Sequence, residues 1–191
     1  PGPVEREGGL DVLFVVDATG SMGWVLDEVK ARIIDIAAVV RSLVPIARFG
    51  IVAYRDEDDP GFVTKAQPLT YSTLKLQGFL DGLTAEGGGN MFEAVYDGVK
   101  AGIEGSDWRS GARKILILVD EAHTAFGSVH RSDTHETEKR LAGNIIKMMG
   151  DPAMRVKVLW GLMTSRPDEL DPDVKSRTPL QIPIFDPEGE D

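Results

Sequence analysis

Three side chains that carry oxygen alternate along a short stretch near the start of the chain. Asp17, Thr19 and Ser21 are separated by single small residues. The stretch follows an apolar run at 10–16 and precedes a long amphipathic segment, so we expect a turn between a strand and a helix. One carboxylate and two hydroxyls facing one side of such a turn suit a hard divalent cation. The spacing therefore predicts a Mg²⁺ site, which Mn²⁺ or Ca²⁺ would also fit because they accept similar oxygen ligands.

Helix capping is the alternative interpretation of the same three residues. Asp, Ser and Thr accept hydrogen bonds from the free amides at helix starts in many proteins. Capping needs one such residue, whereas this stretch supplies three at alternating positions. The pattern favours the metal site, and a metal-free scaffold is the alternative function if capping is the whole role of these residues.

Apolar runs of strand length alternate with amphipathic segments along the chain. The continuous apolar runs predict strands that are buried on both faces. They lie at 10–16, 48–54 and 114–119, with a further strand expected at 155–162 and weaker strand patterns at 62–69 and 180–185. Helical spacing of apolar residues predicts helices between them. These lie at 22–43, 73–83, 92–103 and 136–149.

The alternation of strands and helices predicts an α/β fold. We expect a doubly wound, mostly parallel, Rossmann-like sheet with helices on both faces and one short antiparallel edge strand. In the first helix, an apolar stripe at steps of three and four residues should face the sheet. It consists of Leu26, Val29, Ile33, Ile36, Val40 and Leu43. Ligands of such folds bind beyond the carboxyl ends of the strands, and the turn at Asp17 lies on that edge.

Two segments resemble a known family. The segment 15–22, Val-Val-Asp-Ala-Thr-Gly-Ser-Met, resembles the first metal-binding loop of the von Willebrand factor A (VWA) family. The segment 49–56, Phe-Gly-Ile-Val-Ala-Tyr-Arg-Asp, is similar to the VWA domains found beside alpha-kinase domains. The resemblance implies a VWA-type domain over 9–164. It leaves 165–191 as a C-terminal extension that either completes the sheet or links to another domain.

The resemblance also implies two further metal-binding loops, and both are altered here. The family uses a threonine from a glycine-rich loop, but Gly89 stands at that position, so Asn90 or a water would substitute. The family also uses an aspartate after a later strand, and the best register places Glu121 there, with Asp120 one position early. Because adjacent side chains diverge, one of these two acids would face the cation, and Glu121 is preferred.

The resemblance implies a function in protein binding. In the VWA family, an acidic side chain of a partner protein completes the coordination of the cation. We therefore expect a metal-ion-dependent adhesion or interaction module, in which the metal is a contact and not a catalyst. Such modules occur inside and outside cells, so the resemblance indicates no cellular location.

Composition limits the other classes of function. The 191 residues, 42% of them hydrophobic, suffice for one sizeable core. The net charge of −10 repels phosphate backbones and argues against a nucleic-acid partner. The chain has no cysteine, which excludes disulfides and thiolate catalysis, and no apolar run of the length that spans a bilayer. The start at Pro1, without an apolar leader, leads us to expect a segment of a longer protein.

Three other patterns compete for an enzymatic or metal role. The sequence Asp-Glu-Ala-His at 120–123 matches the acidic box of one class of helicases, but the chain has no Gly-x4-Gly-Lys-Ser/Thr loop to hold a nucleotide. A Mg²⁺-dependent phosphoryl transferase with Asp17 as nucleophile would resemble the haloacid dehalogenase family, which needs a second aspartate where Thr19 stands. His123, His130 and His135 share one loop region, but their spacing fits no zinc motif. Separately, the acidic loop at 55–61 allows a local pair of Arg55 with Asp56. Ca²⁺ binding is an alternative for its acids, but acids on a surface loop are more often solvated, so we expect them to be solvated.

Overall fold

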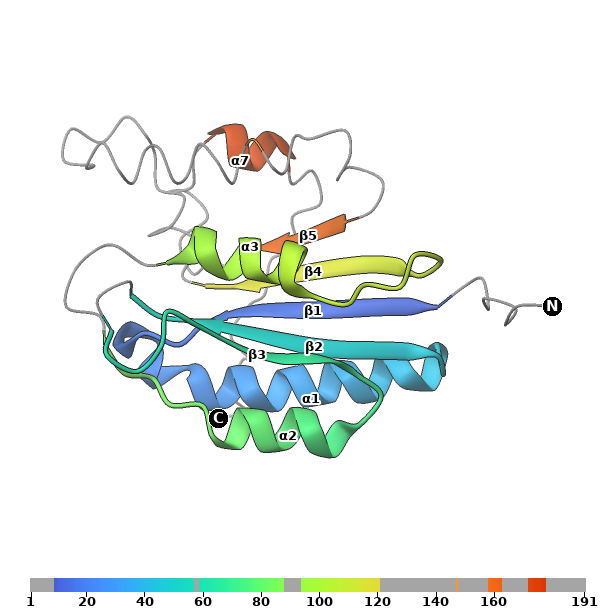
Figure 1. Cartoon of the computed structure of the whole chain (residues 1–191), viewed down its shortest axis with the longest axis horizontal. Coiled ribbons are helices and arrows are strands. Elements are labelled where there is room, and N and C mark those ends of the chain that lie inside the picture. The colour runs from blue at the N-terminus through green and yellow to red at the C-terminus, as the bar shows by residue number, and fades with distance from the viewer. Residues whose placement is uncertain are drawn as a thin grey trace, which may run out of the picture.

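The computed structural model describes residues 9–56, 59–87, 94–120, 147, 158–162 and 172–177. A five-stranded sheet with the order β3-β2-β1-β4-β5 forms its centre (Figure 1). The strands are β1 (Leu10–Asp17), β2 (Ala47–Tyr54), β3 (Thr64–Thr70), β4 (Arg113–Val119) and β5 (Val158–Leu162). β1 pairs in parallel with β2 and β4, and β4 pairs in parallel with β5. β3 is an antiparallel edge strand on β2, so the predicted fold class is confirmed.

Helices cover both faces of the sheet. They are the 3-10 helix η1 (Gly20–Trp24) and the helices α1 (Leu26–Leu43), α2 (Thr73–Asp81), α3 (Val95–Gly105) and α7 (Pro172–Arg177). Figure 1 shows α1 and α2 on one face of the sheet and α3 on the other. No helix among the described residues has the length and apolar character needed to cross a membrane.

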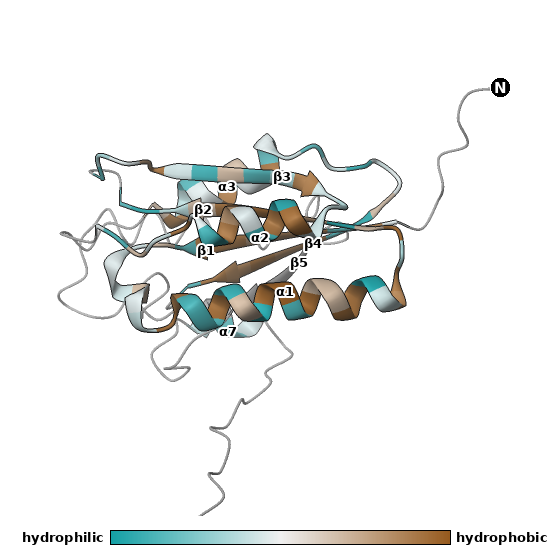
Figure 2. Cartoon of the chain, turned by 90° about the horizontal axis from the view of Figure 1, so that it is seen from below, coloured by the Kyte–Doolittle hydropathy of each residue, from teal (hydrophilic) through white to brown (hydrophobic). Residues whose placement is uncertain are grey.

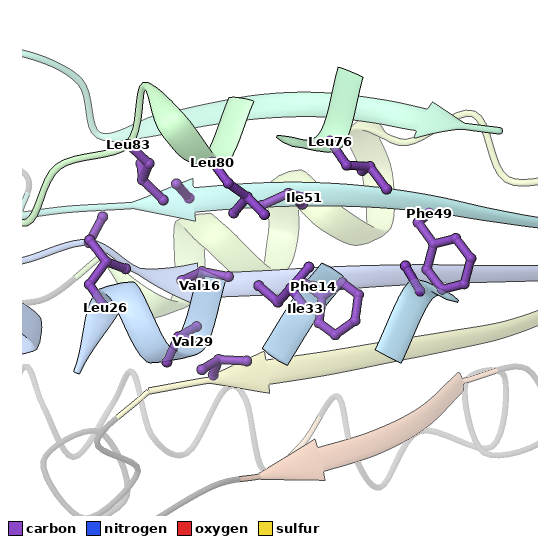
Figure 3. Close-up of a cluster of buried hydrophobic side chains, with 14 of the residues drawn as sticks. Phe14, Val16, Leu26, Val29, Ile33, Phe49, Ile51, Leu76, Leu80 and Leu83 are labelled. Atoms are coloured by element: carbon purple, nitrogen blue, oxygen red, sulfur yellow. The ribbon is translucent and has the colours of Figure 1, made fainter. Parts of the chain in front are cut away.

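Strand β1 contributes side chains to both hydrophobic cores, because successive side chains point to opposite faces of the sheet. Phe14 and Val16 pack into the core beneath α1 and α2 (Figure 3). Leu13 and Val15 pack into the second core beneath α3. Burial on both faces explains why the central strands are continuous apolar runs in the sequence.

The predicted apolar stripe of the first helix is partly wrong. Figure 2 shows α1 with hydrophobic and hydrophilic residues intermixed along its length. Ile36 is 39% exposed and Leu43 is 76% exposed, whereas Ala37 is fully buried. A helix of 3.6 residues per turn carries the inward stripe from Ile33 to Ala37, and Ile36 falls outside it. The helix also begins later than predicted, at Leu26, because Gly20–Trp24 form the separate helix η1.

Several predicted elements lie partly or wholly outside the described residues. The predicted helix at 136–149 is described only at Lys147, which is helical, and the predicted strand at 180–185 is not described. Helix α7 falls within the predicted C-terminal extension. The domain boundary after residue 164 stays a prediction.

A charged network joins three segments at the amino-terminal edge of the sheet. The buried carboxylate of Asp11 accepts hydrogen bonds from the guanidinium of Arg48 at 2.9 and 3.0 Å. It also accepts from the guanidinium and the backbone amide of Arg109, at 2.7 to 2.9 Å. Arg48 further contacts Asp107 at 3.0 Å. The network connects β1 and β2 to the segment that leads into β4.

Candidate metal and ligand-binding site

The turn after β1 gathers the three predicted oxygen-bearing residues. The backbone amide of Thr19 donates to Asp17 Oδ1 at 2.8 Å, and the hydroxyls of Thr19 and Ser21 lie 2.9 Å apart. Asp17 and Thr19 are buried, whereas Ser21 is exposed. The turn therefore presents oxygen atoms from the core outwards to the surface.

Helix capping does not account for these residues. Thr19 precedes η1 but makes no side-chain capping hydrogen bond, and α1 is preceded by Val25, which has no polar side chain. The carboxylate of Asp17 bonds the amide two residues ahead, which stabilises the turn itself. The capping alternative is therefore wrong for helix α1.

Asp120 lies at the neighbouring strand end. The register pairs Val16 with Val119, so Asp17 and Asp120 directly follow adjacent positions of two parallel strands. Neighbouring strands lie about 4.8 Å apart. Asp120 is 5% exposed and Asp17 is fully buried, so two carboxylates are withdrawn from water at this edge. A pair of buried carboxylates creates a negative potential that favours a cation.

The other predicted ligands lie outside the described residues. These are Asn90 and Glu121, together with the loop histidines His123, His130 and His135. Within the described part of the chain, no three acidic or histidine side chains form a group that could hold a metal. The donor set present there is two carboxylates and two hydroxyls, which fits a hard cation that needs further oxygens from elsewhere.

The prediction that the acids of the loop at 55–61 are solvated is wrong for two of them. Asp56 is 3% exposed, and the side chain of Asp59 is 4% exposed. Asp59 lies 3.5 Å from the guanidinium of Arg55 and accepts a hydrogen bond from the amide of Gly61 at 2.6 Å. An arginine beside an acidic loop withdraws the acids from water by pairing with them.

Arg55 is the residue at this edge whose role the sequence did not reveal. Its side chain is 5% exposed, and its guanidinium donates to the carbonyl oxygen of Thr84 at 2.8 Å and to the Thr84 hydroxyl at 3.0 Å. The same guanidinium lies 3.5 Å from Glu86 and 4.4 Å above the ring of Phe62. The sequence suggested a local pair of Arg55 with Asp56, and in the structure the guanidinium contacts Asp59, Thr84 and Glu86.

Backbone hydrogen bonds join the Asp17–Ser21 turn to its neighbours. Ala18 donates to Tyr54 O at 2.9 Å, and Glu86 donates to Ala18 O at 3.2 Å. The amide of Gly20 donates to Gly87 O at 3.2 Å. A Cβ on Gly20 would lie 2.6 Å from that oxygen, so this close approach requires glycine.

An aromatic side chain is exposed beside the turn. Trp24 ends η1, the same short helix that contains Ser21, and is 74% exposed. Tryptophan is enriched among the residues that dominate binding in protein interfaces. The outer surface of η1 thus carries a hydroxyl and a large apolar ring.

Two curated relatives match the chain. The chain is 27% identical to Alpha-protein kinase vwkA of Dictyostelium discoideum over 146 residues, which are 75% of this chain and 21% of the kinase. It is 32% identical over 91 residues to Putative ariadne-like RING finger protein R811 of Acanthamoeba polyphaga mimivirus, covering 48% of this chain and 9% of that protein. The chain spans less than a quarter of the length of either relative.

Solved structures share the fold. BatB from Bacteroides thetaiotaomicron superimposes with a TM-score of 0.53 at 13% identity, over 80% of this chain and 64% of that one. The pilus adhesin SpaC from Lactobacillus rhamnosus GG gives 0.50 at 17% identity, over 65% of this chain and 16% of that one. At these identities the likeness shows that the chain shares the fold of both proteins.

The matching family model is a different one from the VWA family. The model described as ATPase family associated with various cellular activities (AAA) matches residues 83–185. This range contains β4 and the acids after it, and P-loop NTPases also use an acid at a strand end to hold Mg²⁺. The sequence contains no Gly-x4-Gly-Lys-Ser/Thr segment. The match covers more than half of its residues, so the chain belongs to the AAA family.

Proposed function

We propose that this chain is a VWA-type module that binds a protein ligand through a divalent cation at the carboxyl edge of its sheet. The observation that carries the proposal is the turn in which the buried Asp17 carboxylate and the paired hydroxyls of Thr19 and Ser21 come together. The likeness to the alpha-kinase relative and to adhesin folds supports a role in interaction.

The proposed cation is Mg²⁺, with Mn²⁺ or Ca²⁺ as substitutes. Asp17, Thr19 and Ser21 would hold it from one turn, and Asp120 or Glu121 would supply the second acid. Asn90, directly or through a water, would complete the protein's share. The bound cation would supply an open position for an acidic side chain of the partner, as the family resemblance implies.

The partner surface would extend beyond the cation onto η1. Trp24 lies three residues after Ser21 and exposes its ring to solvent. A buried interface would cover that ring, which gives a reason for a tryptophan at an exposed position of a turn. The proposed ligand is a protein that offers a carboxylate to the cation and an apolar contact to Trp24.

Titration calorimetry with Mg²⁺, Mn²⁺ and Ca²⁺ tests the cation. The wild type should release or absorb heat with at least one of the three, whereas Asp17→Asn should show none because it loses the charge but keeps the oxygen that bonds Thr19. A pull-down with Mg²⁺, repeated with chelator, should retain a partner only when the cation is present. Absence of heat in the wild type would favour a metal-free scaffold.

Nucleotide or phosphate-ester hydrolysis is the competing function, favoured by the AAA match. We expect no hydrolysis of ATP or of phosphatase substrates with Mg²⁺, because no lysine of this chain follows a glycine in the phosphate-binding arrangement. Turnover that disappears in Asp120→Asn or Asp17→Asn would show instead that the module is an enzyme.

A further inference from the structure

Arg55 connects four segments at the carboxyl edge of the sheet. Its backbone amide donates to Val63 O at 3.0 Å, and its carbonyl accepts from the amide of Ala94 at 3.3 Å. Its side chain bonds both oxygens of Thr84 through one nitrogen. A single buried residue thus touches the end of β2, the loop before β3, the segment before α3 and the segment 83–87.

The segment 83–87 in turn holds the proposed cation-binding turn. Glu86 donates to Ala18 O, and Gly87 accepts from the amide of Gly20. Gly87 has a φ of +81°, and a Cβ there would lie 2.4 Å from a carboxylate oxygen of Asp59. Gly87 therefore lies in close contact with both Asp59 and Gly20. Asp59 is itself paired with Arg55.

We infer that Arg55 is a positioning residue, which fixes the Asp17–Ser21 turn by tethering the segment 83–87 to the end of β2. The inference rests on the proposed function for its effect on the cation, but the tether itself consists of contacts among the chain's own residues. Residues that orient the metal ligands through hydrogen bonds affect metal affinity strongly, although they do not touch the metal.

Arginine suits this place better than lysine because of its fork of donors. One nitrogen reaches both oxygens of Thr84, while the other lies between Asp59 and Glu86. An ammonium group has no planar arrangement that serves these two directions at once. Replacement by lysine keeps the charge that Asp59 needs and removes the two-sided attachment.

Amide hydrogen exchange of the metal-free protein tests the tether directly. In Arg55→Lys, the amides of Gly20 and Glu86 should exchange at least about tenfold faster, because their hydrogen bonds join the turn to the segment 83–87. Amides in the middle of β1 should keep their rates. Arg48→Lys is the matched control, since it alters a half-buried arginine at the opposite edge and should leave the Gly20 and Glu86 rates unchanged.

A second pair of variants separates the tether from general stability. Thr84 is exposed, so Thr84→Val should fold normally while losing the hydroxyl that Arg55 binds. It should accelerate Gly20 exchange less than Arg55→Lys, because the Thr84 carbonyl remains. Thr84→Ser keeps the hydroxyl and should behave like the wild type.

Calorimetry with Mg²⁺ then tests the effect on the cation. Arg55→Lys should weaken binding about tenfold or more, and Arg48→Lys should not. Unchanged exchange at Gly20 and Glu86 in Arg55→Lys would overturn the tether, and faster exchange with unchanged Mg²⁺ affinity would overturn its positioning role. If the wild type binds no cation, the proposed function fails, and the exchange rates alone support or overturn the tether.

Discussion

At the scale of single residues, the side chain of Thr19 has a structural part and a proposed binding part. It is buried, and its hydroxyl lies 2.9 Å from that of Ser21. The methyl group of threonine contributes to packing, whereas the hydroxyl is the proposed cation ligand. Two substitutions can remove one of these features at a time.

We predict that Thr19→Val and Thr19→Ser differ in cation binding and not in stability. Thr19→Val removes the hydroxyl and should lower the free energy of unfolding by about 1 kcal/mol. Thr19→Ser removes the methyl group and should cost a similar amount, about 0.8 kcal/mol. Calorimetry should find Mg²⁺ affinity retained in Thr19→Ser and reduced about tenfold or more in Thr19→Val. Equal Mg²⁺ affinities in the two variants would contradict a ligand role for this hydroxyl.

At the scale of elements, two glycines let α3 approach the sheet closely. A Cβ at Gly98 would lie 2.6 Å from the ring of the buried Tyr54. A Cβ at Gly102, one turn later, would lie 2.8 Å from the side chain of Leu13. The helix therefore presents a face of small residues to β1 and β2, and its close packing on this face of the sheet depends on them.

We predict opposite effects for glycine-to-alanine changes in two helices. Gly98→Ala should destabilise the protein by about 1–3 kcal/mol, because the ring of Tyr54 is enclosed and cannot move aside. Gly78→Ala in α2 meets nothing within 4 Å, so it should stabilise by about 0.5–1 kcal/mol through helix propensity. Urea unfolding of both variants measures the difference. A stable Gly98→Ala would mean that α3 packs at a greater distance than described.

At the scale of the whole molecule, Asp11 links segments far apart in sequence. Burial raises the pKa of Asp11, but the hydrogen bonds from Arg48 and Arg109 outweigh it and hold the pKa below its ordinary value of 3.8. The same contact raises the pKa of Arg48. The folded protein therefore favours the charged carboxylate more strongly than the unfolded chain does.

Acid unfolding measures this contribution. Because the folded pKa is lowered, the stability from Asp11 is complete above about pH 4 and is lost as pH falls through the folded pKa. The melting temperature of the wild type should fall more steeply below about pH 4 than that of Asp11→Asn, which has no proton to gain there. Asp11→Asn should be the less stable protein at neutral pH. Parallel curves for the two proteins would show that Asp11 does not set the acid limit.

The elements that the sequence predicted well are those with a continuous pattern. The runs at 10–16, 48–54 and 114–119 became β1, β2 and β4 with ends shifted by one residue, because a strand buried on both faces must be apolar throughout. The amphipathic helix α1 was predicted in type, but its inward stripe was assigned to Ile36 where Ala37 is buried. Hydrophobicity alone ranks isoleucine above alanine, and only helix geometry selects the smaller residue.

In the candidate site, too, local features could be predicted from the sequence and long-range contacts could not. Asp17, Thr19 and Ser21 are close in sequence, so their turn could be predicted, and the cation they would hold stays a prediction. The tether of Arg55 to Thr84 joins residues 29 positions apart, and the bonds of Asp11 to Arg109 join residues 98 positions apart. No local pattern encodes a partner at such a distance.

The sequence by itself determined the alternation of strands and helices and the oxygen-rich turn on the carboxyl edge, because both follow from the spacing of residues that are close together in the sequence. The tertiary structure alone decided which residues partner the buried charges, as in the hydrogen bonds that the buried Asp11 accepts from Arg48 and Arg109. The physical reason is that a buried charge is stable only beside a partner, and packing of the whole sheet brings the partners to one place.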